Sequence, residues 1–143
     1  MHREIVRCNP SWCTKYPRYD TVLITTNEGA WGMARFRVAR VRHLWSFVLG
    51  DVAYACAFVE WFVTKDDGPD EATGLWVVQP ELVDDVRVTS IISIASIARA
   101  CHLMPVLGHT FLPTDFHFSD TLDAFHSYYV NAYIDYHSHE VIL

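Results

Sequence analysis

The sequence lacks the short glycine-rich and nucleophile motifs that identify many enzymes. Its six glycines are scattered, and neither a GxGxxG fingerprint nor a Walker-type loop is present. A GxSxG nucleophile elbow is also missing. The glycines therefore offer no cradle for a phosphate group.

Cysteines are few, and long apolar runs are absent. The four cysteines (Cys8, Cys13, Cys56 and Cys101) show no CxxC spacing, so they predict no disulfide framework and fit a reducing compartment. No run approaches 18 uninterrupted apolar residues, which excludes an ordinary transmembrane helix. Residues 1–7 lack the apolar core of a signal peptide. We therefore expect an intracellular protein that does not cross a membrane.

Apolar residues, in contrast, are plentiful. They make up 51% of the 143 residues, while charged residues make up 20%. A chain of this length forms one domain and buries roughly two thirds of its unfolded surface without needing a metal or disulfides. Pro10 and Pro17 interrupt the start, so residues 1–18 are predicted to be an irregular lead-in to a single domain at 19–143.

Charge is divided unevenly between the two parts of the chain. The first 50 residues carry eight Lys or Arg against three acids, which gives +5. The remaining residues carry three Lys or Arg against fourteen acids, which gives -11 and the overall charge of -6. This division predicts either a surface for a polyanion or an attraction between the two parts inside the fold, and the sequence leaves both open.

Most of the chain has the pattern of β-strands. Residues 19–26 are rich in β-branched and aromatic residues, and residues 31–41 alternate until the phase slips by one after Val38, which predicts a bulge. Residues 43–49 form either a further strand or the continuation of this one. Residues 52–64 are apolar on both faces, which favours a central strand, although a short apolar run is also compatible with a helix. Short strands are expected at 75–78 and 86–92.

Two helices are expected in the second half. A short one is predicted at 93–103, with Ser93 or Ser96 as its cap. A longer amphipathic helix is predicted at 121–136, where apolar residues recur at intervals of three and four. The expected fold class is therefore mainly β (α+β): a small bent β-barrel of the SH3-like or BAH-like type, packed by a C-terminal amphipathic helix.

The first half contains the best candidates for ligand contact. Arginines on one strand face can bind phosphates, and neighbouring aromatic rings can stack on bases. The alternative is a strand face kept soluble by charge. Trp31 and Trp45 are candidates for an apolar patch that binds a protein partner, and a methyl-lysine cage would need three converging rings and an acid such as Glu60. The candidate nucleic-acid-binding residues are Arg35, Arg37, Arg40 and Arg42.

The C-terminal tail contains residues of the types that bind transition metals. Asp135, His137, His139 and Glu140 are weak candidates, because they form no HExxH or cysteine-paired signature. A metal-dependent hydrolase built on this tail is the alternative function. The adjacent pair at 101–102 is predicted to be structural rather than catalytic, since neighbours on a helix point about 100° apart.

The segment 111–140 resembles the C-terminal tail of proteins encoded by Plavaka-type and related DNA transposons of mushroom-forming fungi. Segments 16–20 (YPRYD) and 97–106 (IARACHLMPV) are similar to the upstream parts of that family. Tyr136 departs from the pattern, since the family has a histidine there, and this thins the tail's histidine cluster. The matching residues in the tail are Phe111, Leu112, Pro113, Asp115, Phe116, His117, Ser119, Leu122, Asp123, Phe125, Tyr128, Tyr129, Val130, Asn131, Tyr133, Asp135, His137, His139 and Glu140.

This resemblance implies the terminal β-rich module of a transposase-like protein, without its nuclease domain and without assigned catalytic residues. The expected function is therefore a non-catalytic binding or accessory module in the nucleus. Its partner would be DNA or a chromatin or transposase protein, and no cofactor or small-molecule substrate is expected.

Overall fold

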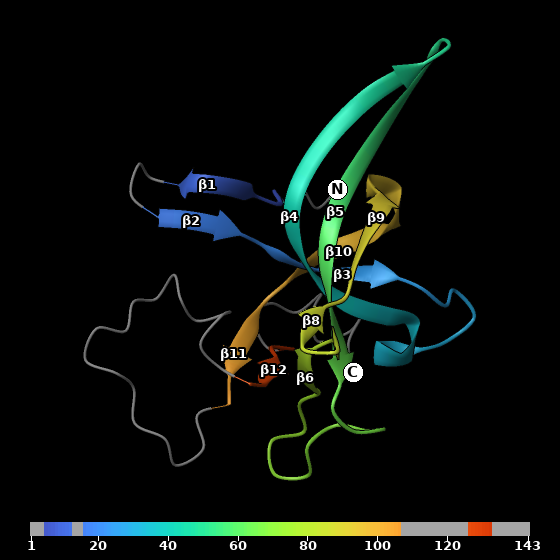
Figure 1. Cartoon of the computed structure of the whole chain (residues 1–143). Helices are drawn as coiled ribbons and strands as arrows, with labels where there is room; N and C mark the ends of the chain where they lie inside the picture. Colours follow the sequence, from blue (N-terminus) through green and yellow to red (C-terminus); the bar gives the residue numbers. More distant parts are fainter. Residues whose placement is uncertain (1–4, 13–15, 107–125, 133–143) are drawn as a thin grey trace.

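The computed structural model describes residues 5–12, 16–106 and 126–132. Its largest feature is an antiparallel hairpin of two long strands, β4 (Phe36–Leu49) and β5 (Val52–Thr64), which extends well beyond its neighbours (Figure 1). The strands are joined by a tight turn at Gly50. Its φ of 63° is a value that glycine adopts readily and most other residues avoid.

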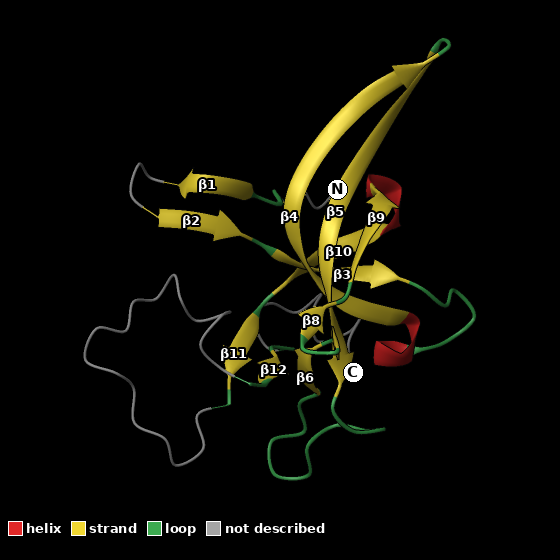
Figure 2. Cartoon of the chain, in the orientation of Figure 1, coloured by secondary structure: helices red, strands yellow, loops and turns green. Residues whose placement is uncertain are grey.

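The central sheet curls into a small barrel (Figure 2). Strand β3 (Thr21–Thr25) pairs with β4 and with β10 (Ile97–Cys101), while β9 (Thr89–Ser93) pairs with β5. The short 3-10 helix η2 (Ile94–Ser96) leads from β9 directly into β10, so it links the two edges of the sheet. The barrel is therefore nearly closed. The predicted mainly β fold with a small bent barrel is confirmed.

Strand β4 is continuous and contains one bulge. Its register against β5 shifts between Val41 and His43, so Arg42 is the extra residue. The slip in the sequence pattern thus marks a real bulge, a few residues beyond Val38. Residues 43–49 continue the same strand.

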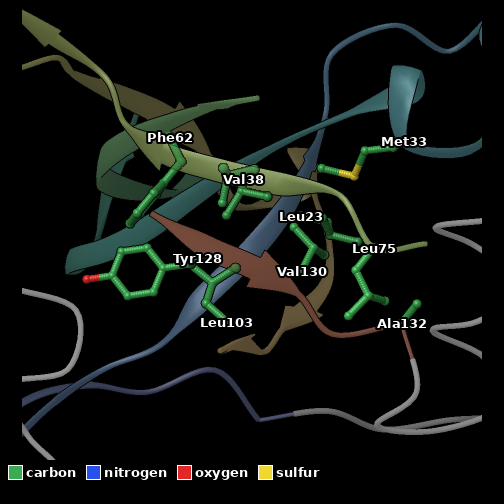
Figure 3. Packing of buried hydrophobic residues seen from close by; sticks show 10 residues of the cluster. Leu23, Met33, Val38, Phe62, Leu75, Leu103, Tyr128, Val130 and Ala132 are labelled. Carbon is green, nitrogen blue, oxygen red and sulfur yellow. The ribbon is translucent and has the colours of Figure 1, made fainter. Parts of the chain in front are cut away.

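Apolar side chains pack on both faces of this sheet. Inside the barrel, Val22, Val41 and Val59 belong to one buried cluster. On the opposite face, a second cluster includes Phe62 and Tyr128 (Figure 3). Strands β6 (Val77–Pro80), β11 (Leu103–Pro105) and β12 (Tyr128–Val130) contribute to this second layer. These two clusters explain why the inner part of β5, from Ala57 to Phe62, is apolar on both faces, whereas residues 52–55 are exposed.

The start of the chain is more ordered than predicted. Strands β1 (Cys8–Trp12) and β2 (Tyr16–Tyr19) form a separate hairpin, although residues 1–18 were expected to be irregular. Two-stranded hairpins tolerate proline because each strand has an unpaired edge. The register of this hairpin is interrupted between Asn9 and Trp12. A second small hairpin joins β7 (Leu82–Val83) to β8 (Val86–Arg87).

A C-terminal helix was predicted at 121–136, but the residues of this range that the structure describes contain a strand and no helix. Residues 128–130 form β12, which pairs with both β6 and β11. Tyr128 and Val130 are fully buried and two positions apart, which is the spacing of a strand. Their packing against neighbouring strands therefore prevails over the helical spacing of the sequence. Residues 121–125 and 133–136 lie outside the described residues.

The helix predicted at 93–103 is also wrong. Only η2 is helical there, and the chain continues as β10 and β11. The other short helix is η1 (Gly32–Arg35), which precedes β4. Within the described ranges, no helix is long and apolar enough to cross a membrane.

Candidate functional site

Two of the four candidate arginines are held in contacts within the fold. Arg37 forms an ion pair with Glu81, and its guanidinium lies 4.3 Å from the centre of the Trp61 ring. Arg40 is buried, with 4% of its surface exposed. Arg35, by contrast, is exposed at the end of η1. The structure therefore does not gather these side chains into one exposed stripe.

The fourth arginine, Arg42, belongs to a cluster around Tyr19. Its guanidinium lies 4.1 Å from the centre of the Tyr19 ring, and that of Arg40 lies 5.4 Å from the same ring. The Nε atom of Arg42 is 3.6 Å from a carboxylate oxygen of Glu60. Like Glu81, Glu60 belongs to the acidic part of the sequence. These ion pairs favour attraction between the two parts of the chain, and nucleic-acid binding by the arginines stays a prediction.

The outer part of the β4–β5 hairpin, residues 43–58, is called the arm below. At its base, residues 56–58 pair with β9, and beyond them the arm continues past β3 and β9 as a ribbon of two strands (Figure 1). Asp51, at the turn, is its only Asp, Glu, Lys or Arg residue. A two-stranded ribbon is marginal in water unless one of its faces is covered. An apolar arm of this kind is therefore a candidate for contact with another molecule.

One face of the arm carries nearly all of its large side chains. Residues paired across two antiparallel strands share a face, so the pairing register assigns each residue. His43 and Trp45 stack with ring centroids 5.6 Å apart, as do Phe47 and Tyr54 at 5.3 Å. We call this surface the aromatic face. It consists of the pairs His43–Phe58, Trp45–Cys56, Phe47–Tyr54 and Leu49–Val52.

The opposite face of the arm is made of smaller side chains. Its pairs are Leu44–Ala57, Ser46–Ala55 and Val48–Ala53. At the base of the arm this face continues the interior of the barrel, because Ala57 is fully buried and Leu44 packs against the same cluster. Further out, Ser46, Val48, Ala53 and Ala55 are exposed. The two faces therefore differ in their side chains: one carries the rings, and the other carries smaller residues.

The aromatic face is open to solvent over most of its length. Phe47 is 45% exposed, Leu49 68% and Tyr54 43%. The face widens toward the barrel, where Phe58 pairs with Ile91 of β9, which is 66% exposed. Contiguous exposed apolar surface is rare on single domains and marks sites of interaction.

Of the two candidate tryptophans, the structure places Trp45 on this face and Trp31 elsewhere. Trp45 lines a shallow pocket with His43 and Phe58. Trp31 is 90% exposed but precedes η1, at the other end of β4. The sequence reading missed Phe47 and Tyr54, although the near absence of charge over 43–58 was a visible signal.

The described part of the chain contains Cys101 but not the metal-binding candidates of the tail. The tail candidates Asp135, His137, His139 and Glu140 lie outside the described residues. Among the residues described, no three His, Cys, Asp or Glu side chains form a group that could hold a metal ion. Burial raises the pKa of the Cys101 thiol to about 12, although Arg99 acts to lower it. That thiol is protonated at neutral pH, as a structural cysteine would be.

Comparison with known proteins adds no identity. No family model, curated protein or solved structure matches the chain. The resemblance to fungal transposon proteins therefore stays a prediction. What the chain does is inferred from its fold and its surface alone.

Proposed function

We propose that this chain is a non-catalytic module that binds a protein partner through the aromatic face of its arm. The observation that carries this proposal is the exposure of Phe47, Leu49, Val52 and Tyr54 on one face of a projecting ribbon. Fully burying an apolar side chain of this size is worth about 1.5–3 kcal/mol. Several half-exposed side chains together supply enough for specific association.

The chemistry of the arm suits a protein better than a nucleic acid. Nucleic-acid binding depends on Lys and Arg that neutralise phosphates. The arm has neither, and its one charged residue, Asp51, is acidic. Trp, Tyr and Arg are enriched where protein interfaces gain most of their energy, and the aromatic face carries Trp45 and Tyr54 with Arg42 at its base.

The alternative function, binding to duplex DNA through the arginines, makes a different prediction. Such binding would weaken steeply with salt and would depend on Arg35, the exposed member of the set. Fluorescence anisotropy with duplex DNA at two salt concentrations measures both properties. Salt-sensitive binding that Arg35→Gln reduces, with no effect of changes on the arm, would overturn the proposal.

A photo-crosslinking residue placed on the arm tests the proposal directly. Position 47 lies on the aromatic face, and position 48, which is 70% exposed, lies on the opposite face of the same strand. We expect crosslinks to protein from position 47 and few from position 48. Equal yields from the two positions, or none from position 47, would contradict a specific interaction of the aromatic face.

A further inference from the structure

We infer that the partner of the aromatic face is a second copy of this chain. This inference rests on the proposed function and names its partner. Two arms pack with their aromatic faces together and run in opposite directions about a two-fold axis. Such isologous pairs are the commonest way in which soluble proteins form oligomers.

Charge complementarity points to this arrangement. Asp51 lies at the tip of the arm, and Arg42 borders the aromatic face at its base, beside Glu60. The two residues are roughly 25 Å apart along the strand. When two arms run in opposite directions, the tip of each reaches the base of the other. Asp51 of each copy then meets Arg42 of the other, and the contact forms twice.

Arg42 keeps the capacity for such a contact. Its side chain is 35% exposed, and its Nε atom is 3.6 Å from Glu60, which is longer than a hydrogen bond. The guanidinium can therefore donate to a carboxylate of the second copy without losing a strong bond to Glu60. The chain has a net charge of -6, but each arm contributes only one acid, so the packed faces do not place like charges against each other.

The area available is sufficient for a weak to moderate dimer. Aromatic side chains bury 150–250 Å² each when fully covered, so a half-exposed face of this size offers about 500 Å² per copy. The pair would then bury about 1,000 Å², which is the lower limit for a specific protein interface. The arrangement also covers one face of each two-stranded ribbon, and the isolated arm has no such cover.

Sedimentation velocity of the purified chain over a range of concentrations tests this inference. The variant F47K/Y54K places two charges on the aromatic face, while the matched control V48K/A53K places them on the opposite face of the same strands. We expect dimers for the wild type and the control, and a dissociation constant raised by about 100-fold or more for F47K/Y54K. A monomeric wild type at high micromolar concentration, or equal loss in both variants, would overturn the inference.

Charge reversal tests the direction of the arms. D51R changes only the exposed turn and should weaken the dimer. D51R/R42D/E60Q should restore it, because both contacts between the copies are then reversed together and E60Q removes the carboxylate that would repel the new acid at position 42. If the triple variant is folded by circular dichroism but no tighter than D51R/E60Q, the opposed arrangement is wrong. A monomeric chain that still crosslinks to another protein from position 47 would reject the second copy and leave the proposed function standing.

Discussion

Phe47 and Tyr54 stack across the arm with ring centroids 5.3 Å apart, yet both rings stay more than 40% exposed. The pair is thus organised by contacts within the arm before any partner arrives. Rings that are already fixed lose little conformational entropy on binding, which makes them efficient contact residues.

Truncating this pair should separate stability from binding. Phe47→Ala removes a stacking contact worth about 0.5–1.5 kcal/mol but little buried area. We expect the free energy of unfolding in urea to fall by about 1 kcal/mol or less, while dimer formation weakens markedly. A large loss of stability with unchanged association would show that the ring serves the fold instead.

For the buried cluster that contains Phe62 and Tyr128, we expect substitutions to affect stability much more than association. Phe62 and Tyr128 are 1% and 0% exposed and meet edge to face, with centroids 6.0 Å apart. Replacing a buried aromatic residue by alanine costs about 3–5 kcal/mol, so Phe62→Ala should lower the urea midpoint strongly. Tyr128→Ala should match it, because β12 packs in the same cluster. A cost near that of a surface substitution would mean that β12 contributes little.

The arginines provide a matched comparison. Arg37→Gln removes the ion pair with Glu81 and the contact with the Trp61 ring, and we expect it to lower the free energy of unfolding by about 1–2 kcal/mol. Arg35→Gln makes the same chemical change at an exposed site and should alter stability by less than about 0.5 kcal/mol. Thermal or urea unfolding of the two variants measures the difference. Equal effects would argue against a structural role for Arg37.

The burial of Cys101 should make the free energy of unfolding depend on pH in the alkaline range. Its pKa is raised from 9.0 to about 12, so the folded state holds the thiol proton more tightly than the unfolded state does. This contribution is complete below pH 9 and is lost as the pH rises toward 12, by at most about 1.4 kcal/mol per pH unit. Unfolding of Cys101→Ala should therefore depend less steeply on pH between 9 and 12 than that of the wild type. Parallel curves would contradict this assignment.

The strands could be predicted where a local pattern decides them. The alternation broken near Val38 indicated a bulge, which the structure places at Arg42, and the two apolar faces of residues 52–64 indicated a central strand. Residues 128–130 were misread, because their strand depends on β6 and β11. Those partners are distant in the sequence, and the apolar spacing of the segment suits a helix equally well.

The site was harder to predict than the fold, for two physical reasons. An apolar segment predicts burial, and nothing local shows that β4 and β5 extend beyond the strands that would cover them. The partners of the arginines are also distant, since Glu81 lies 44 positions after Arg37. An exposed and an internally paired arginine have the same appearance in a sequence, and only the tertiary contacts distinguish them.

The extra residue at Arg42 sets the phase of the strand that carries the rings. Val41 pairs with the inward-facing Val59 and His43 with the outward-facing Phe58, so Arg42 is the only residue of β4 without a partner on β5 at this step. Removing it would leave a regular alternation, and Trp45 and Phe47 would keep their partners on β5. A bulge bends its strand and increases the local twist. A single deletion would thus leave the ring surface intact and change the direction in which it projects from the barrel.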